Sequence, residues 1–180
     1  ERLVAELSDK IQDELGDYVF SANGESMEQI VGYYLGMRGA TLAVAESCTG
    51  GLLAERITSI SGSSRYFMGG AVVYSNELKT TLAGVPAKLI AQHGAVSRAV
   101  AISLAQGIRT RAGATFGIGI TGIAGPTGGT AEKPVGLVFV ALADNSDSQV
   151  TERRYPGDRD RIRLWASFTA LDMIRRKLMN

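Results

Sequence analysis

The sequence of 180 residues contains only one cysteine, Cys48, and one histidine, His93. A single cysteine excludes a disulfide within the chain and is typical of proteins from a reducing cytoplasm, where we expect this one. A single histidine excludes a metal site built from several histidines of one chain, and we expect neither a metal ion nor another cofactor. Proline is also scarce, with four residues, so the composition does not indicate a proline-rich linker.

Long hydrophobic runs and a strong net charge are missing as well. The longest apolar run, residues 135–143, is too short to cross a bilayer, and no signal peptide is visible. Nineteen basic and 18 acidic residues give a net charge of +1, so no overall field attracts nucleic acid or an anionic membrane. The basic excess of residues 151–180 leaves nucleic-acid binding as an alternative that predicts steep salt dependence, but the balanced charge argues against it.

Glycine is the residue type in excess, with 22 in 180 residues, against about 7% in an average chain. Apolar residues make up 45% of the sequence, enough for the core of one globular domain. Eight glycines lie between residues 113 and 136, and five more lie between residues 50 and 70. We expect this excess to serve a site that contacts a phosphate group and an oxyanion rather than general flexibility.

Residues 1–25 are predicted to form a helical extension and linker that precedes a main domain of residues 26–180. Apolar residues recur every four positions on an amphipathic helix with an acidic outer face, at Leu3, Leu7, Ile11 and Leu15. Because the chain begins with glutamate rather than methionine, we expect it to be processed, trimmed or cut from a longer protein.

Strands and helices alternate in the main domain. Short apolar or alternating runs predict five strands, at residues 41–45, 70–74, 115–121, 135–143 and 149–155. Helices are predicted at residues 52–60, 76–83, 86–92, 97–111 and from Asp158 onward, and Ser26 with Gln29 fits a capping box that opens one more. This order predicts a three-layer α/β/α sandwich with a mixed, mostly parallel β-sheet.

The first candidate site segment is Glu46-Ser-Cys-Thr-Gly-Gly51, directly after the first strand and before a helix. Ligands of parallel sheets gather at the carboxyl ends of strands, and a helix that begins here aims free N–H groups at whatever Ser47 faces. The segment equally suits an ordinary turn in which Ser47 or Thr49 caps the helix. The pattern alone does not decide between the two.

The second segment, Tyr74-Ser-Asn-Glu-Leu-Lys79, follows the second strand. A serine nucleophile needs a base, and a lysine that loses its proton through burial can serve without histidine. Ser47 and Lys79 are therefore candidates for a Ser–Lys pair. The spacing also suits a solvated helix lysine and a Tyr74 that only packs.

Two other residues could take these roles. Cys48 could be the nucleophile, but it neighbours Ser47, so we expect the two side chains to point apart, and small buried cysteines are common. His93 could be the base, but it lies at a predicted helix end before a glycine, where a cationic side chain favours the dipole without catalysis.

The third segment is the glycine-rich loop of residues 121–130, which follows a strongly apolar strand. Successive N–H groups in such a loop can form an anion-binding nest, but the loop equally suits a mobile connection between strands. The glycines at 117, 119 and 122 imitate a dinucleotide-binding pattern, which we reject because no helix follows them.

The fourth segment opens the last helix with Arg159 and Arg161, which oppose the helix dipole unless Asp158 and Asp160 neutralise them. The functional alternative is that Arg159, or less readily Arg161, binds a phosphate group. At the other end of this helix, the basic residues 175–177 are interpreted as charges that favour the dipole.

Together these segments resemble the C-terminal domain of the competence/damage-inducible protein CinA, the nicotinamide mononucleotide deamidase family. The resemblance covers roughly residues 28–178 and rests on six segments in the right order: Ala45-Glu-Ser-Cys-Thr-Gly-Gly51, Tyr74-Ser-Asn-Glu-Leu-Lys79, Gln92-His-Gly-Ala-Val-Ser97, Thr121-Gly-Ile-Ala-Gly-Pro126, Glu132-Lys-Pro-Val-Gly136 and Gly157-Asp-Arg159. Residues 17–20 are similar to the connection to an N-terminal domain, which in full-length members resembles molybdopterin-binding proteins.

The resemblance implies hydrolysis of the carboxamide of nicotinamide mononucleotide to nicotinic acid mononucleotide and ammonia, without a metal or another cofactor. In this interpretation Ser47 attacks the amide carbon, Lys79 relays the proton, and Tyr74 orients or assists. The alternative from another class is a nucleotide-binding or regulatory module, associated with competence or DNA damage, that has no catalytic turnover.

Substrate binding is assigned to seven residues: Thr49, Gly50, Gly51, Thr121, Gly122, Gly125 and Arg159. The resemblance implies that Thr121 and the glycine loop hold the nucleotide. On physical grounds alone, we expect the N–H groups of residues 49–51 to stabilise an oxyanion and Arg159 to bind the phosphate. Family analogy implies a homodimer, and the composition argues against membrane or direct nucleic-acid partners.

Overall fold

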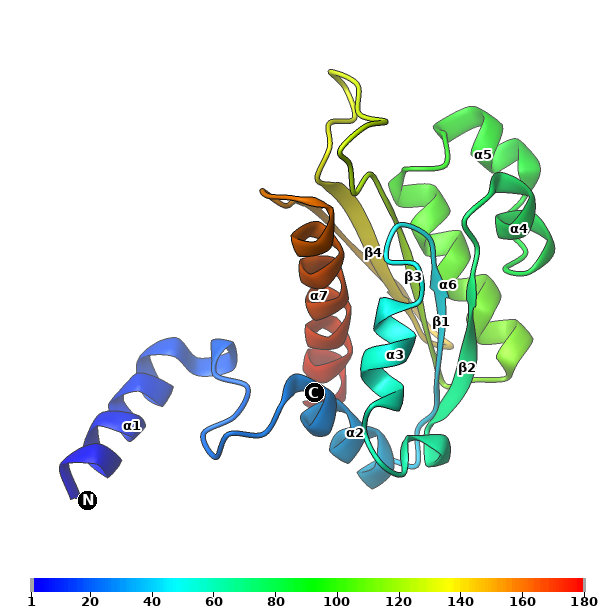
Figure 1. Cartoon of the computed structure of the whole chain (residues 1–180). Helices are drawn as coiled ribbons and strands as arrows, with labels where there is room; N and C mark the ends of the chain where they lie inside the picture. Colours follow the sequence, from blue (N-terminus) through cyan, green and yellow to red (C-terminus); the bar gives the residue numbers. More distant parts are fainter. Residues whose placement is uncertain (1, 180) are drawn as a thin grey trace.

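The computed structural model of the protein describes residues 2–179, so Glu1 and Asn180, the outer ends of the two predicted segments, lie outside the described residues. Its main body has a five-stranded sheet between two layers of helices (Figure 1). The strands are β1 (Leu42–Glu46), β2 (Phe67–Val72), β3 (Phe116–Gly122), β4 (Leu137–Ala143) and β5 (Ser148–Arg154). The helices are α1 (Arg2–Leu15), α2 (Met27–Met37), α3 (Leu52–Thr58), α4 (Asn76–Thr81), α5 (Ala87–His93), α6 (Arg98–Ala112) and α7 (Arg159–Met179), with short 3-10 turns at Gly16–Tyr18 and Ser63–Arg65.

The strands lie in the order β2-β1-β3-β4-β5. β1 runs parallel to both of its neighbours, whereas β4 pairs antiparallel with β3 and with β5. Four of the five strands therefore point in the same direction, and the predicted three-layer sandwich around a mixed, mostly parallel sheet is confirmed. Because β1, β2 and β3 are parallel, the loops that follow them emerge at one edge of the sheet.

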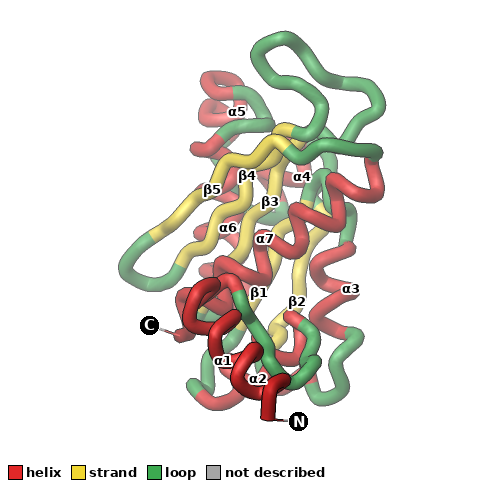
Figure 2. Tube along the Cα trace, turned by 90° about the vertical axis from the view of Figure 1, so that its left-hand side faces the viewer, coloured by secondary structure: helices red, strands yellow, loops and turns green. Residues whose placement is uncertain are grey.

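Different helices cover the two faces of the sheet, as Figures 1 and 2 show. α2, α3 and α7 cover the face to which Val44 and Ile118 contribute, within one continuous core. On the other face Ala43 and Ala45 share a second core with α6 residues such as Leu104. Every residue of β1 is buried, as expected for a strand that is covered on both sides.

Glycines inside β3 let α6 approach the sheet closely. A Cβ atom at Gly117 would lie 2.1 Å from the carbonyl oxygen of Ala105, and one at Gly119 would lie 2.4 Å from that of Ala101. No larger residue fits at these positions without moving the helix. The expectation that the glycine excess serves the candidate site was therefore wrong for these two residues, which serve the packing of a helix on the sheet.

The predicted capping signals are confirmed. Ser26 and Gln29 form a capping box at the start of α2, and the side chain of Ser97 caps α6. Asp158 accepts a hydrogen bond from a backbone N–H group in the first turn of α7. β2 differs from its prediction, because it begins three residues earlier and ends two residues earlier than residues 70–74. Its pairing with β1, rather than its own residue pattern, sets these ends.

α1 stands clear of the main body in Figure 1. Its apolar residues Leu3, Leu7, Ile11 and Leu15 are all between 45% and 80% exposed, so the helix forms as predicted but does not bury its apolar face. Within the described residues, no helix combines the length and the apolar character that crossing a membrane requires.

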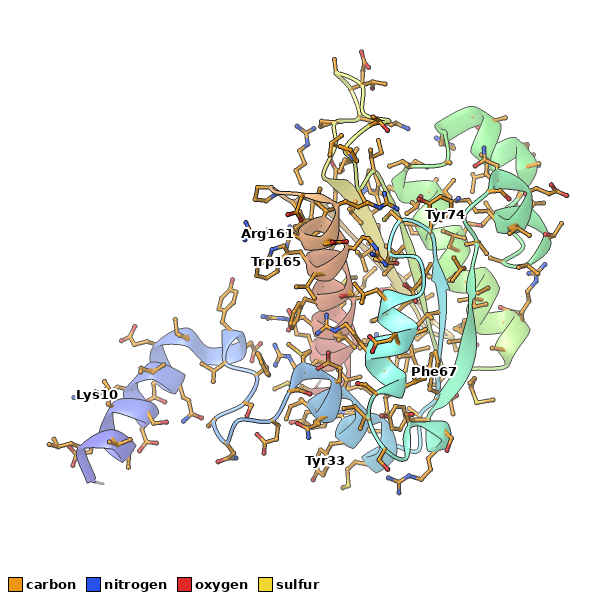
Figure 3. All side chains as sticks on the ribbon, in the orientation of Figure 1. Lys10, Tyr33, Phe67, Tyr74, Arg161 and Trp165 are labelled. Atoms are coloured by element: carbon orange, nitrogen blue, oxygen red, sulfur yellow. The ribbon has the colours of Figure 1, made fainter. Side chains whose placement is uncertain are left out.

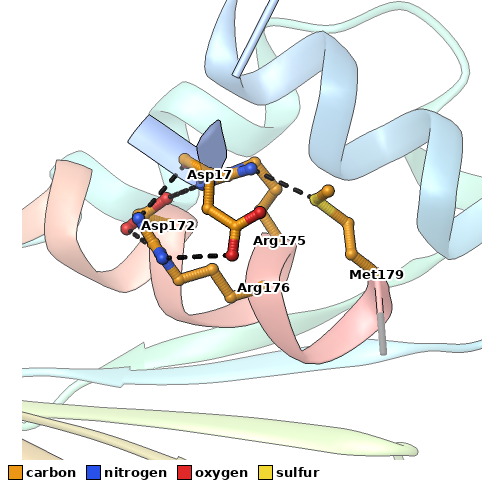
Figure 4. A network of polar contacts seen from close by, with 5 residues as sticks. All are labelled: Asp17, Asp172, Arg175, Arg176 and Met179. Atoms are coloured by element: carbon orange, nitrogen blue, oxygen red, sulfur yellow. Dashed lines mark hydrogen bonds and ion pairs between the residues drawn. The ribbon is translucent and has the colours of Figure 1, made fainter. Parts of the chain in front are cut away.

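The C-terminal arginines do more than favour the dipole of α7. The Nη2 atom of Arg175 donates to the backbone carbonyl of Asp17 and lies 2.6 Å from both this oxygen and the carboxylate of Asp172 (Figure 4). Arg176 binds the other carboxylate oxygen of Asp172 at 2.8 Å. The segment after α1 is therefore attached to the end of α7 by a buried guanidinium group.

Candidate active site

Three loops meet where the parallel strands end. They follow β1, β2 and β3 and line a single cavity of about 340 Å³. All three predicted catalytic residues, Ser47, Tyr74 and Lys79, contribute to its wall. Four predicted binding residues do so as well: Thr121, Gly122, Gly125 and Arg159.

The predicted Ser–Lys pair lies in this cavity. The Nζ atom of Lys79 is 3.2 Å from the Oγ atom of Ser47, a hydrogen-bond distance. Nζ is also 2.9 Å from the carbonyl oxygen of Val73 and 3.2 Å from that of Tyr74. Lys79 is only 2% exposed, and none of the three oxygen atoms that surround its nitrogen belongs to a carboxylate.

This environment favours the neutral form of Lys79. Burial disfavours the ammonium ion and lowers the pKa of Lys79 below its ordinary value. A neutral amine donates its two hydrogens to the two carbonyl oxygens and presents its lone pair to the Ser47 hydroxyl. The arrangement therefore suits a base that takes the proton of Ser47.

A local cap directs Lys79 toward Ser47. The side chain of Ser75 accepts a hydrogen bond from the N–H of Leu78 at 3.1 Å and so opens α4 immediately after β2. The N–H of Lys79 donates to the backbone carbonyl of Ser75, which fixes the lysine in the first turns of the helix. Only three residues thus separate β2 from the helix that carries Lys79.

The carboxylate of Glu46, the last residue of β1, holds the loop that carries Ser47. Its Oε2 atom accepts a hydrogen bond from the N–H of Gly51 at 3.1 Å. Two N–H groups in the first turn of α3 donate to the same carboxylate at 3.1 and 2.8 Å. Glu46 therefore caps α3, the role that the sequence left to Ser47 or Thr49, and the Ser47 hydroxyl stays available for chemistry.

The same hydrogen bonds decide which N–H groups remain for an oxyanion. The N–H of Gly51 binds Glu46, and that of Gly50 donates to the carbonyl oxygen of Ser47 at 3.1 Å. Among the described residues, the N–H groups of Cys48 and Thr49 find no backbone acceptor. The expectation that Gly50 and Gly51 donate to an oxyanion is thereby corrected: the available donors beside Ser47 are Cys48 and Thr49.

Arg159 joins two of the three loops at the cavity. Its Nη1 atom donates to the carbonyl oxygen of Gly125, and its Nη2 atom donates to the hydroxyl of Tyr74, each at 3.0 Å. A guanidinium group has five N–H donors, so others remain for a ligand. Arg161 is exposed, does not line the cavity and lies on the outer side of α7 (Figure 3), which leaves Arg159 as the arginine that a bound phosphate could reach.

The family of the chain follows from its sequence. The pattern of the CinA C-terminal domain matches residues 24–178. This chain belongs to that family. A CinA-like protein from Koribacter versatilis is 64% identical over 176 residues, which cover 98% of this chain and 42% of the relative. A putative competence-damage inducible protein from Desulforudis audaxviator is 46% identical over 175 residues, which cover 97% of this chain and 42% of the relative.

Solved structures of similar proteins share the fold. The competence/damage inducible protein CihA from Agrobacterium tumefaciens has a TM-score of 0.82 and 39% identity, over 89% of this chain and 99% of that chain. The competence damage-inducible protein A (ComA) from Klebsiella pneumoniae has a TM-score of 0.82 and 31% identity, over 87% and 99%. The chain spans about two fifths of the length of the curated relatives, whose names state no reaction.

The two alternatives to the Ser–Lys pair are unfavourable in this CinA-family chain. Burial raises the pKa of the Cys48 thiol to about 12, so the thiol stays protonated near neutral pH. His93 ends α5 and lines a different pocket, together with Lys133. Within residues 2–179, no group of three histidine, cysteine or acidic residues is arranged to hold a metal ion.

Four residues at this CinA-family site differ from what the sequence predicted, either in position or in the hydrogen bonds that they can offer. Thr49 is fully buried, and Thr49, Gly50 and Gly51 are not among the residues that line the cavity, so of the Cys48 and Thr49 N–H groups only that of Cys48 belongs to a residue of the cavity wall. Thr121 donates its hydroxyl hydrogen to the carbonyl oxygen of Ala95 at 2.8 Å, so towards a ligand this hydroxyl can only accept.

The sequence patterns gave no role to three residues that form part of this site: Glu46, Asn76 and Arg163. Asn76 lines the cavity and stood inside a recognised segment, so its polar side chain was a usable signal. Arg163 lies one helical turn after Arg159, and this spacing places both on one face of α7. Nothing local in the sequence indicated that Glu46 would cap a helix several residues ahead.

Proposed function

We propose that this chain hydrolyses the carboxamide of nicotinamide mononucleotide to nicotinic acid mononucleotide and ammonia. The observation that carries the proposal is the 3.2 Å contact between the Ser47 hydroxyl and the buried Lys79 amine at the wall of a cavity. Such a pair supports nucleophilic attack on an amide or ester. The choice of this nucleotide as substrate rests on the resemblance to the deamidase family.

In the first half of the reaction, neutral Lys79 takes the hydroxyl proton as Oγ of Ser47 bonds to the amide carbon. The electron pair of the carbonyl group moves onto its oxygen, where the N–H groups of Cys48 and Thr49 donate to it. One well-placed donor of this kind contributes about 3–4 kcal/mol to stabilising the transition state. The C–N bond then breaks, and the Lys79 ammonium protonates the nitrogen, which leaves as ammonia.

The second half of the reaction frees the serine. A water molecule gives its proton to Lys79 while its oxygen attacks the ester carbon on Ser47. The second oxyanion uses the same two N–H donors. When it collapses, the carbon–Oγ bond breaks, Lys79 returns the proton to Oγ, and the product leaves as a carboxylic acid that loses its proton to water.

The remaining polar groups of the cavity suit the nucleotide part of the substrate. Arg159 supplies charged donors for a phosphate group, and Tyr74, which binds Arg159 through its hydroxyl, fixes the position of that guanidinium. Thr121, Gly122 and Gly125 line the same cavity as this arginine and Ser47.

Ammonia release from nicotinamide mononucleotide tests the proposal. We expect Ser47→Ala and Lys79→Met each to lower kcat by at least about 10³-fold, since the two residues act as a unit. The matched controls are Ser64→Ala and Lys88→Met, whose side chains are exposed and away from the cavity, and these should retain the wild-type rate. No release by the wild type, or full release by Ser47→Ala, would contradict hydrolysis of this substrate.

The names of the relatives mention competence and damage, and this supports the context of a second candidate, a nucleotide-binding module associated with competence or DNA damage. Such a module binds nicotinamide mononucleotide but leaves it unchanged. Calorimetric binding together with the absence of ammonia over many hours would favour this candidate, whereas turnover excludes it.

A further inference from the structure

Arg163, a residue of α7, binds the loop that carries Ser47. Its Nε and Nη2 atoms both donate to the carbonyl oxygen of Thr49, at 3.1 and 2.9 Å. The side chain is only 28% exposed and reaches this oxygen across 114 positions of the sequence. Two donors on one acceptor fix the carbonyl in direction as well as in distance, which a lysine could not do.

The loop is also held at two other points. Glu46 binds the N–H of Gly51, two residues after Thr49. At the start of the loop, the N–H of Ser47 donates to the carbonyl oxygen of Ile120 in β3 at 3.1 Å. Between these anchors lie the N–H groups of Cys48 and Thr49, the two that find no backbone acceptor among the described residues.

α7 therefore contacts all three loops of the site with one face. Arg159 binds the loops after β2 and β3, and Arg163, one turn later, binds the loop after β1. A single long helix of 21 residues thus aligns segments that are distant in the sequence. Donors that stabilise an oxyanion act only when their direction is fixed before the reaction.

We propose that Arg163 is a positioning residue for amide hydrolysis. Its two hydrogen bonds to the Thr49 carbonyl hold the Cys48 and Thr49 N–H groups toward the oxyanion that forms beside Ser47. This inference rests on the proposed function, because it assigns a role within the same reaction. It predicts that Arg163 affects the transition state more than the binding of the substrate.

Arg163→Met keeps most of the aliphatic stem and removes the donors. We expect kcat for ammonia release to fall by about 10- to 100-fold, because displacing a reacting group by about 1 Å can cost as much, while KM changes by less than about twofold. Arg163→Lys restores the positive charge without the two parallel N–H donors of a guanidinium group. Its kcat should lie between that of the wild type and that of Arg163→Met. Arg161→Met, an exposed arginine of the same helix turn, should match the wild type.

Chemical rescue separates positioning from a general loss of structure. Added guanidinium ions at concentrations far below those that unfold the protein should raise the rate of Arg163→Ala in a saturable manner. They should have no such effect on Ser47→Ala, which lacks the nucleophile. If guanidinium leaves Arg163→Ala unchanged, or if KM rises while kcat is retained, the positioning role is wrong.

A covalent probe tests Arg163 independently of the natural substrate. An alkyl phosphonofluoridate forms a P–O bond to Ser47 as its P–F bond breaks, with fluoride leaving and the serine proton passing to Lys79. The same N–H donors receive the phosphoryl oxygen. We expect intact-mass spectrometry to show modification of the wild type that is about tenfold slower in Arg163→Met.

The two assays distinguish the possible failures. If the wild type reacts with the probe but releases no ammonia, the nucleotide substrate is wrong, and slower modification of Arg163→Met still supports the positioning role. The positioning role of Arg163 is overturned if the wild type and Arg163→Met are modified at equal rates. It is also overturned if Ser47 of the wild type does not react at all.

Discussion

Replacing Glu46 with glutamine tests whether one buried carboxylate holds in place the loop that carries Ser47. The carboxylate accepts three backbone hydrogen bonds, from Gly51, Leu53 and Ala54. The glutamine side chain has almost the same shape, but its NH2 group cannot accept a hydrogen bond. At least one N–H group therefore loses its acceptor, and the remaining hydrogen bonds end on a neutral oxygen.

The size of the effect follows from these contacts. A buried N–H group without an acceptor costs about 1–3 kcal/mol. Hydrogen bonds to a charged group contribute about 1.5–3 kcal/mol each, against about 1 kcal/mol for neutral ones, so the two that remain lose roughly 1–4 kcal/mol together. We expect the free energy of unfolding of Glu46→Gln to fall by about 3 kcal/mol, which lowers the melting temperature by roughly 6–12 °C at this chain length.

Urea unfolding followed by circular dichroism measures this loss, with an unchanged m-value showing that the folded state is otherwise intact. Glu55→Gln is the matched control, because Glu55 lies on α3 but is exposed, and its effect should stay within about 0.5 kcal/mol. If Glu46→Gln falls within about 1 kcal/mol of this control, the carboxylate does not cap α3 in the way described.

Three further predictions concern the base, the packing of β3 and the phosphate. Since protonated Lys79 cannot accept the Ser47 proton, and burial lowers the pKa of Lys79, the hydrolysis rate should rise with pH through a midpoint below 10.5; a midpoint at or above that value contradicts the role of burial. Gly119→Ala should lower the free energy of unfolding by about 3 kcal/mol because its Cβ meets α6, whereas Gly36→Ala, with nothing within 4 Å, should not destabilise; equal urea midpoints refute the packing argument. Arg159→Met should raise KM about tenfold with a smaller change in kcat, and a loss in kcat alone, measured by ammonia release, is the opposite result.

Much of the site could be predicted because parallel strands bring the residues that follow them to one edge. Ser47 follows β1 and Lys79 follows β2 closely, so the pairing of these strands suffices to bring them together. Gly50 and Gly51 show the limit of this reasoning. Being near Ser47 did not leave their N–H groups available, because Ser47 and Glu46 already accept from them.

The ends of β2 show a similar limit within the fold. Its residues Phe67–Val72 alternate between half-buried and exposed, and glycines weaken the local strand signal. Hydrogen bonding to β1 extends the strand toward Phe67 all the same. Sequence patterns therefore place such a strand in the right order but not at the right residues.

The sequence left the meeting of Ser47 with Lys79 as one of two alternatives. By itself it determined the order of strands and helices and the caps at Ser26 and Ser97. These features depend on hydrogen bonds between residues three or four apart and on the periodic burial of apolar side chains, which leave a local pattern. Only the tertiary structure decided that Arg163 would bind the carbonyl of Thr49 and that Gly119 would lie against α6. Such contacts join residues that are far apart in the chain, and they depend on how closely the layers pack rather than on any spacing within one segment.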